Sequence, residues 1–347
     1  MTSNRPSSSK KTHWSPLSAL GDIVALVARR AAKPPSGSNI MRLLGEGSTP
    51  IRRLVTQTRN HQEIRNLLDA GTDVIFIGSY FRSGNTWMRC LLSDILLQNR
   101  GVETCTSDSC HTAEMAPDVY CELVSADNLV DGEPMLVKTH EPFGVIRRLS
   151  KDRHSRKTGE IGVRGRIKVL YLYRDPVDVL VSFFHFRLLK SPVVGRFTDL
   201  EAFCRSEFPG WVRHVSSYVR ASDEGAEVFF MSYEQMMREP APALASILHW
   251  MDVPHTPSKT ERAIANMQFG KLRALEENQR AHAREYFFRK GRVGSGATEL
   301  CPESVQRIRD GASVLLARVE QRGSPRQSGS MAGPAPLQVV KSAHYRV

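Results

Sequence analysis

The sequence predicts an α/β fold with a doubly wound, mainly parallel sheet, and three observations support this prediction. Short apolar runs alternate with segments of helical periodicity through the middle of the chain, which is the order of βαβ units. The apolar runs are continuous, as expected for parallel strands that are buried on both faces. The 347 residues are 41% hydrophobic, which is enough for a sizeable core.

The strands are expected at residues 73–79 (DVIFIGS), 135–139 (MLVKT), 168–173 (KVLYLY) and 227–232 (EVFFMS). Helical spacing is expected from Trp87 onward and at residues 177–184, 243–251 and 301–319. Ligands of doubly wound sheets bind beyond the carboxyl ends of the strands. The polar motifs that follow these strands are therefore expected to share one site.

The first strand runs into YFRSGNTWMR at residues 80–89. A Ser-Gly-Asn-Thr turn that opens a helix presents backbone N–H groups without intrahelical partners, and the helix dipole adds partial positive charge there. Such a turn binds anions. Asn85 stands where loops that bind nucleoside triphosphates carry lysine, whereas Arg82 supplies a cation three residues earlier. The loop is P-loop-like, and the substitution indicates a different phosphate ester.

The second strand ends in VKTHEPF, where Lys138 and His140 flank Thr139. In an extended chain their side chains point to the same face. A histidine can take a proton from an alcohol, and a lysine beside it can hold an anionic oxygen. By itself the motif also fits a hydrogen-bonded structural histidine. Glu141 is the second candidate for the base because it is adjacent.

Two later motifs supply cations. The third strand runs into YRDPVDVLVSFFHF, where Arg174 and Ser182 could meet around a second anion, although an ion pair at a helix start is the alternative. Near the end of the core, FFRKGRVGSG places Arg289 and Lys290 beside Gly291, which suits a phosphate, although a solvated basic loop is also compatible.

Together these pieces resemble the cytosolic-type sulfotransferases that use 3'-phosphoadenylyl sulfate (PAPS). The resemblance covers roughly residues 73–320 and rests on five motifs in one order: YFRSGNTW, KTHEPF, YRDPVDVLVSFFHF, FMSYEQMMREP and FFRKGRVG. It implies transfer of a sulfuryl group from PAPS to an acceptor hydroxyl or amine, with release of adenosine 3',5'-bisphosphate (PAP). It implies no required metal.

The resemblance also implies a role for each site residue. His140 would be the general base, Lys138 would assist near the moving sulfuryl group, and Arg82 would stabilise charge on the departing phosphate. The 5'-phosphosulfate would be bound by Arg82, Ser83, Gly84, Asn85 and Thr86. Adenine would be contacted by Trp87, Tyr233 and Phe269, and the 3'-phosphate by Arg174, Ser182, Arg289, Lys290 and Gly291.

Three departures from the family pattern stand out. Phe81 and Arg82 replace the Pro-Lys pair that usually opens the loop. The tryptophan that often follows RKGxxG is absent, and Ser295-Gly296-Ala297 stands in its place. The usual dimer segment is not recognisable in KLRALEENQRAHAREY, so the oligomeric state is left open.

Charge is unevenly distributed along the chain. The first 60 residues hold ten basic and two acidic residues and so carry most of the net charge of +12, which argues against a nucleic-acid-binding core. We predict a basic, flexible N-terminal extension at residues 1–72, a sulfotransferase domain at 73–320 and a flexible tail at 321–347. Without a secretory signal or transmembrane segment, the predicted location is cytoplasmic, with organelle targeting through the extension as the alternative.

Two other functions stay open at this point. One is a P-loop-type kinase, against which stand the missing loop lysine and the lack of a clear magnesium aspartate, since Asp175 follows Arg174 and leads into a proline turn. The other is a nucleotide-binding relative without catalysis. The predicted partner is a small-molecule, lipid or glycan acceptor that carries a hydroxyl group, with no nucleic acid. The segments at 100–134 and 144–166 are expected on the acceptor side.

Overall fold

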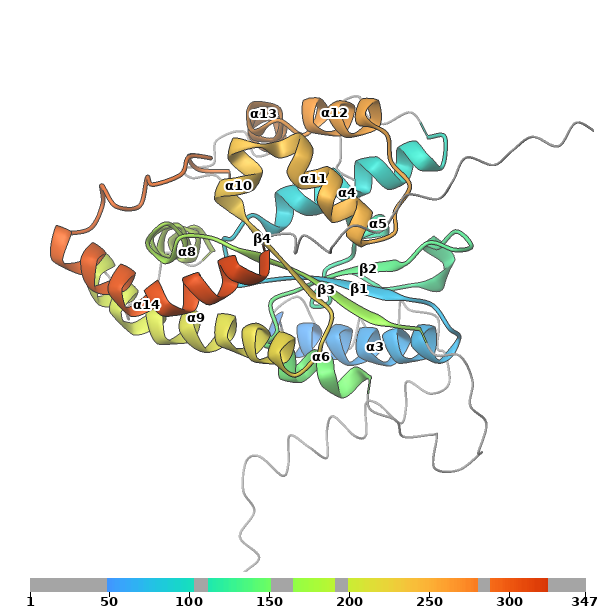
Figure 1. Cartoon of the computed structure of the whole chain (residues 1–347), viewed down its shortest axis with the longest axis horizontal. Coiled ribbons are helices and arrows are strands. Elements are labelled where there is room, and N and C mark those ends of the chain that lie inside the picture. Colours follow the sequence, from blue (N-terminus) through green and yellow to red (C-terminus); the bar gives the residue numbers. More distant parts are fainter. Residues whose placement is uncertain (1–48, 103–111, 151–164, 191–198, 280–287, 324–347) are drawn as a thin grey trace, which may run out of the picture. The chain divides into compact units, whose positions relative to one another are not determined.

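The computed structural model describes residues 49–102, 112–150, 165–190, 199–279 and 288–323. The chain divides into two units after Val55, and the sheet belongs to the second unit, Thr56–Val347 (Figure 1). The elements, in chain order, are α3 (Thr49–Asp69), β1 (Val74–Ser79), α4 (Asn85–Asn99), α5 (Thr112–Met115), η1 (Ala126–Asn128), β2 (Met135–Thr139), α6 (Phe143–Leu149), β3 (Ile167–Tyr173), α8 (Pro176–Lys190), α9 (Leu200–Asp223), β4 (Val228–Ser232), α10 (Tyr233–Arg238), α11 (Pro240–Trp250), α12 (Pro257–Asn266), α13 (Phe269–Gln279) and α14 (Pro302–Gly323).

The four strands form a parallel sheet in the order β2-β1-β3-β4. This confirms the predicted α/β fold, and each strand lies within one residue of its predicted bounds. The central strand β1 is buried along its whole length, which explains why its apolar residues run without alternation.

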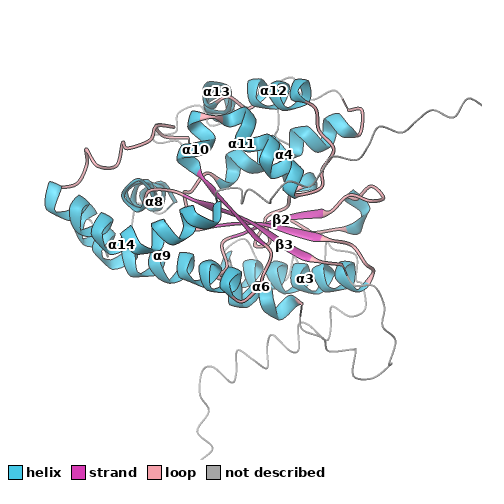
Figure 2. Cartoon of the chain, in the orientation of Figure 1, coloured by secondary structure: helices cyan, strands magenta, loops and turns pink. Residues whose placement is uncertain are grey.

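Helices cover both faces of the sheet (Figure 2). Val74 and Phe76 belong to a core with α3, α6, α8, α9 and α14, whereas Ile75 and Ile77 belong to a core with α4, α10, α11, α12 and α13. Alternate residues of one strand therefore contribute to two separate apolar layers, as strand geometry requires. Over the described ranges, no helix is both long and apolar enough to cross a bilayer.

The helix α3 corrects part of the predicted extension. Its residues Ile64, Leu67 and Leu68 are buried in the core beneath the sheet, so the segment is not flexible up to residue 72. The physical reason is a helical spacing of apolar residues, which allows one face of the helix to be buried. Residues 1–48 and 324–347 lie outside the described residues, and their predicted flexibility stays a prediction.

The carboxyl ends of all four strands meet at one edge of the sheet because the strands are parallel. These ends are Ser79, Thr139, Tyr173 and Ser232. The residue that follows each end belongs to one of the sequence motifs. The sheet therefore gathers the motifs at the edge where doubly wound folds bind ligands.

Candidate active site

The loop between β1 and α4 has an unusual backbone at two positions. Arg82 has a φ of 67° and Gly84 a φ of 95°, both in the left-handed region. A Cβ at Gly84 would also lie 2.7 Å from Cδ2 of Tyr233, so this position needs glycine for both conformation and space. The loop ends at the N-terminus of α4, a helix of 15 residues, where free N–H groups and the dipole favour an anion.

Asn85 ties this loop to the strand before it. Its Nδ2 donates to the carbonyl of Ile77 at 2.8 Å and to Ser79 Oγ at 3.1 Å. Among the described residues, the buried Oδ1 of Asn85 and the buried Oγ of Ser83 accept or donate no hydrogen bond. Buried polar atoms without partners are rare, and here they lie in the predicted phosphosulfate loop. Thr86 follows, half-buried, in the first turn of α4.

Arg82 reaches from the loop to α8. Its Nε donates to Ser182 Oγ at 3.1 Å, and its guanidinium carbon lies 5.1 Å from the ring centre of Phe186. Burial, then the charge of Arg174 and, more weakly, that of Arg289 lower the pKa of Arg82 to about 10, although the charge of Glu276 acts in the opposite direction. Three arginines from distant parts of the chain are thus close enough to repel one another, which favours binding of an anion between them.

Arg174 is buried where β3 ends. Its Nη2 donates to Asp178 Oδ2 and to the carbonyl of Arg292, each at 3.0 Å. Its guanidinium carbon lies 4.3 Å from the ring centre of Tyr233. Within the described ranges, its Nε has no hydrogen-bond partner. A buried cationic donor without an acceptor is costly, so this nitrogen indicates a site for a ligand oxygen.

Asp178 connects α8 with the loop at residues 289–299, which we call the basic loop. Its carboxylate accepts from the N–H groups of Gly294 at 2.8 Å and Gly296 at 2.7 Å. Earlier in the loop, Gly291 has a φ of 59°, and a Cβ there would lie 2.4 Å from the ring of Phe269. These contacts order the loop, although the tryptophan expected after RKGxxG is missing.

Tyr233 connects the predicted nucleotide contacts. It packs on Gly84 and Arg174, and its ring centre lies 6.2 Å from that of Trp87 at an angle of 70°. Trp87 is half-buried and its Nε1 donates to the carbonyl of Met267 at 2.9 Å. The predicted adenine residues Trp87 and Tyr233 are thus neighbours, and Phe269 is placed against Gly291.

His140 follows β2 and is fixed by the end of β1. Its Nδ1 lies 2.8 Å from the carbonyl oxygen of Ser79 and 3.3 Å from Ser79 Oγ. Because a carbonyl oxygen only accepts, Nδ1 carries the hydrogen, and the neutral ring keeps a lone pair on Nε2. Burial, and then the charge of Lys138, lower the pKa of His140 to about 3. The imidazole is therefore neutral at pH 7 with Nε2 able to accept a proton.

An aromatic ring packs against His140. The ring centre of Phe81 lies 4.6 Å from that of the imidazole, and the ring of Phe183 stacks on Phe81 at 4.8 Å and 8°. The ring of Tyr80 also meets Phe81 edge-on at 5.4 Å. Phe81 is 36% exposed although it is large and apolar. No role was predicted from the sequence for Phe81 or Phe183. The signal for Phe81 was its departure from the family pattern, and the signal for Phe183 was the aromatic run FFHF.

The turn after β2 is held from α9. His214 Nε2 donates to the carbonyl of His140 at 3.1 Å, and the hydroxyl of Tyr171 lies 2.8 Å from His214 Nδ1. Tyr218 donates its hydroxyl to the carbonyl of Glu141. Burial lowers the pKa of His214 to about 4, so it stays neutral and bridges the two partners. The motifs alone did not reveal this second histidine.

Lys138 and Glu141, the other two candidates beside His140, both have partners. Lys138 forms an ion pair with Asp118. Burial by itself would raise the pKa of Asp118, but the charge of Lys138 outweighs burial, so the pKa is lowered. The carboxylate of Glu141 is buried and accepts from Gln57 and from Thr139 Oγ1 at 3.4 Å, and it contacts His61 Nε2 at 3.2 Å. These contacts favour His140 over Glu141 as the base.

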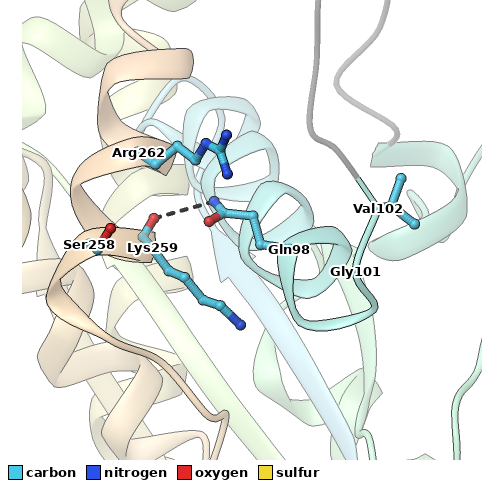
Figure 3. Close-up of a pocket in the computed structure, with 6 residues that line it drawn as sticks. All are labelled: Gln98, Gly101, Val102, Ser258, Lys259 and Arg262. Carbon is cyan, nitrogen blue, oxygen red and sulfur yellow. Dashed lines mark hydrogen bonds between the residues drawn. The ribbon is translucent and has the colours of Figure 1, made fainter.

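A surface hollow lies at the far end of α4 from this site (Figure 3). It is lined by Gln98, Gly101, Val102, Ser258, Lys259 and Arg262. Lys259 and Arg262 are basic, but Lys259 Nζ already donates to Asn99 Oδ1 at 2.8 Å. The hollow contains none of the predicted site residues.

Comparisons with known proteins identify a family model and relatives that match this chain. A family model described as "Sulfotransferase domain" matches residues 72–319. Cytosolic sulfotransferase 7 of Arabidopsis thaliana is 28% identical over 260 residues, which is 67% of this chain and 75% of the relative. Flavonol 3-sulfotransferase of Flaveria bidentis is 27% identical over 278 residues, which is 72% of this chain and 86% of the relative.

Solved structures with a similar fold include retinol dehydratase with retinol and PAP. It has a TM-score of 0.51 and 18% identity, and the match covers 74% of this chain and 86% of that one. The same enzyme with androsterone and PAP matches at a TM-score of 0.50 with 18% identity, over 74% of this chain and 85% of that one. At 18% identity, these similarities show a shared fold and nothing about substrates.

Proposed function

The chain belongs to the sulfotransferase domain family, and from that premise we propose that it transfers the sulfuryl group of PAPS to an acceptor hydroxyl or amine and releases PAP. The proposal rests on one observation: an anion-binding group of residues and a neutral histidine lie at the same edge of the sheet. One is a helix-opening loop with Arg82, Arg174 and Arg289 near it. The other is a neutral His140 held by Ser79, the last residue before that loop.

The donor is bound by the loop and the cations. The N–H groups at the start of α4 and the side chain of Arg82 hold the 5'-phosphosulfate. Trp87, Tyr233 and Phe269 contact the adenine. The 3'-phosphate is bound by Arg174, Ser182, Arg289, Lys290 and Gly291, and the buried Nε of Arg174 supports this assignment because it lacks a partner among the described residues.

His140 accepts the proton in the transfer step. As the acceptor oxygen attacks sulfur, its proton passes to His140 Nε2, and the bond between sulfur and the bridging oxygen of PAPS breaks. The electron pair of that bond remains on the departing phosphate, where Arg82 and the loop N–H groups stabilise the charge. The lowered pKa leaves His140 unprotonated at neutral pH but also makes it a weaker base, and the negative charge of bound PAPS would raise that pKa.

Lys138 is proposed to act through its charge at the same step. The charge of its ammonium lowers the pKa of His140, and the ion pair with Asp118 offsets that charge in part. A transferring sulfuryl group carries less negative charge than a phosphoryl group. Fixed cations and N–H donors are therefore sufficient in place of the usual loop lysine.

The kinase alternative is less well supported. Asp175, its candidate magnesium ligand, accepts hydrogen bonds from the N–H groups of Val177 at 2.8 Å and Asp178 at 3.2 Å. This is the geometry of a helix cap at the start of α8. The carboxylate that a kinase would need for magnesium is thus used to begin a helix.

The acceptor is proposed to be a small molecule, a lipid or a glycan that carries a hydroxyl group, and the first of these has the most support. The exposed ring of Phe81 beside His140 offers an apolar surface to such a molecule, and one relative is named for a flavonol. Lipid and glycan acceptors belong to the same proposal. The names of the cytosolic relatives support a cytoplasmic location.

Calorimetric titration tests the proposal first. The full chain is titrated with PAP and, separately, with ATP and magnesium. Tight binding of PAP with weak binding of ATP is expected, and acceptors are then screened with radiolabelled PAPS. A preference for ATP with magnesium would contradict the sulfotransferase assignment and favour the kinase.

A further inference from the structure

Glu299 lies at the centre of a group of cations near the predicted 3'-phosphate site. Its Oε1 accepts from Arg289 Nη1 and from Lys290 Nζ, each at 2.8 Å, and its Oε2 lies 2.6 Å from His185 Nε2. Burial would raise the pKa of Glu299, but the hydrogen bonds from Lys290, Arg289 and His185 outweigh it and hold the pKa at about 2. One carboxylate therefore binds both cations of the RKG motif.

The position of Glu299 is itself well fixed. Its N–H donates to the carbonyl of Gly296 at 3.0 Å, and the N–H of Gly296 donates to Asp178 at 2.7 Å. His185 lies three residues after Ser182 on α8, so both side chains lie on the same face of that helix. Through Glu299, Arg289 and Lys290 are drawn toward the helix face that carries Ser182.

We propose that Glu299 is a positioning residue for the 3'-phosphate site: its carboxylate holds Arg289 and Lys290 against α8 and so orders the basic loop in place of the missing tryptophan. This inference rests on the proposed function, because it assumes that these two cations bind the 3'-phosphate. Glu299 itself contacts the nucleotide only through them.

Both cations keep donors for a phosphate while they contact Glu299. A guanidinium has five N–H groups and an ammonium has three. The contact with Glu299 uses one hydrogen of each. Long basic side chains lose rotamer entropy when they become ordered. A carboxylate that orders them in the free protein removes part of that cost from nucleotide binding.

The test compares two nucleotides that differ in the 3'-phosphate. Calorimetry measures the Kd of PAP and of adenosine 5'-monophosphate for the wild type, Glu299→Gln and Glu299→Asp. We expect Glu299→Gln to weaken PAP binding by about tenfold and to change monophosphate binding by less than about twofold. Glu299→Asp keeps the charge and should recover part of the lost affinity.

The control is Glu303→Gln, since Glu303 is exposed at the start of α14 and its replacement removes the same charge nearby. It should leave both Kd values unchanged, and thermal unfolding checks that each variant is folded. Unchanged or tighter PAP binding by Glu299→Gln would overturn the proposal, because Glu299 would then be a bystander or a competitor of the phosphate. An equal loss for both nucleotides would also overturn it. If the wild type itself does not prefer PAP over the monophosphate, the proposed function fails instead.

Discussion

The proposed donor half and the proposed acceptor half of the site differ in how their charges are balanced. The donor half, made of the loop at 80–86, Arg174 and the loop at 289–299, contains five cationic side chains. Asp178 pairs with Arg174, Glu299 pairs with Arg289 and Lys290, and the charge of Glu276 acts on Arg82. The acceptor half pairs Lys138 with Asp118 and keeps His140 neutral. Excess positive charge suits the anionic donor, whereas a neutral, aromatic setting suits an uncharged hydroxyl group.

Because the two halves differ in this way, we expect chemistry and donor binding to be separable. His140→Ala should lower the rate of sulfuryl transfer by at least about 100-fold, because general-base catalysis contributes about that much or more. The Kd of PAP should stay within about threefold, since His140 does not belong to the donor half. Transfer is measured with radiolabelled PAPS and binding by calorimetry.

A comparable loss of PAP binding in His140→Ala would contradict the separation of the two halves. Glu141→Gln is the matched variant, because Glu141 was the other candidate for the base. It should leave much more transfer activity than His140→Ala.

Arg174 gives the second largest expected effect. Arg174→Ala should weaken PAP binding by about 10- to 100-fold, because hydrogen bonds to charged groups contribute about 1.5–3 kcal/mol. Binding of adenosine 5'-monophosphate should change much less. Calorimetry with the two nucleotides measures the difference.

Removal of Arg174 also leaves Asp178 buried without its cation, which destabilises the fold. Arg174→Lys is therefore tested beside it, since lysine keeps the charge but loses the planar fork. Equal weakening of both nucleotides by both variants would argue against a 3'-phosphate contact.

The pH dependence of stability should show the neutral histidines of the acceptor half. His140 and His214 have folded pKa values of about 3 and about 4, below the value near 6.5 of an unfolded histidine. Between pH 6.5 and 4 the unfolded chain therefore binds more protons than the folded one. Stability from these groups is present above pH 6.5 and is lost as the pH falls, by up to about 1.4 kcal/mol per pH unit for each histidine.

His214→Gln should reduce the slope of the unfolding free energy against pH in that range. His249→Asn is the control, since His249 is exposed on α11. Urea unfolding at a series of pH values measures the slope. An unchanged slope in His214→Gln would contradict a neutral buried His214.

The smallest expected effect concerns Gly84. Gly84→Ala should cost about 1–2 kcal/mol from the left-handed backbone, and the contact with the ring of Tyr233 should add to that cost. Gly101→Ala is a matched control, because Gly101 also has a positive φ, 71°, but nothing lies within 4 Å of its Cβ position. Denaturant unfolding of both variants isolates the Tyr233 contact, and equal losses would show that this contact has no energetic effect.

The sequence predicted the strands and the motifs because both are local signals. Continuous apolar runs bounded by polar residues indicated β1 to β4, and parallel pairing then required that the motifs after them share an edge. The extension was predicted less well. Composition suggested a flexible segment up to residue 72, yet Ile64 and Leu68 are buried in the core, and the helical spacing there was the available signal.

The sequence alone therefore determined the fold class, the family and the polar motifs of the site, because strand patterns and helix-start signals act over a few residues. Tertiary structure decided the partners that act between distant segments. His214 supports the turn at His140 from 74 residues away, and Asp178 binds Gly296 across 118 residues. Such pairs depend on how helices pack on the sheet, and nothing in the local sequence specifies which buried polar atoms will meet.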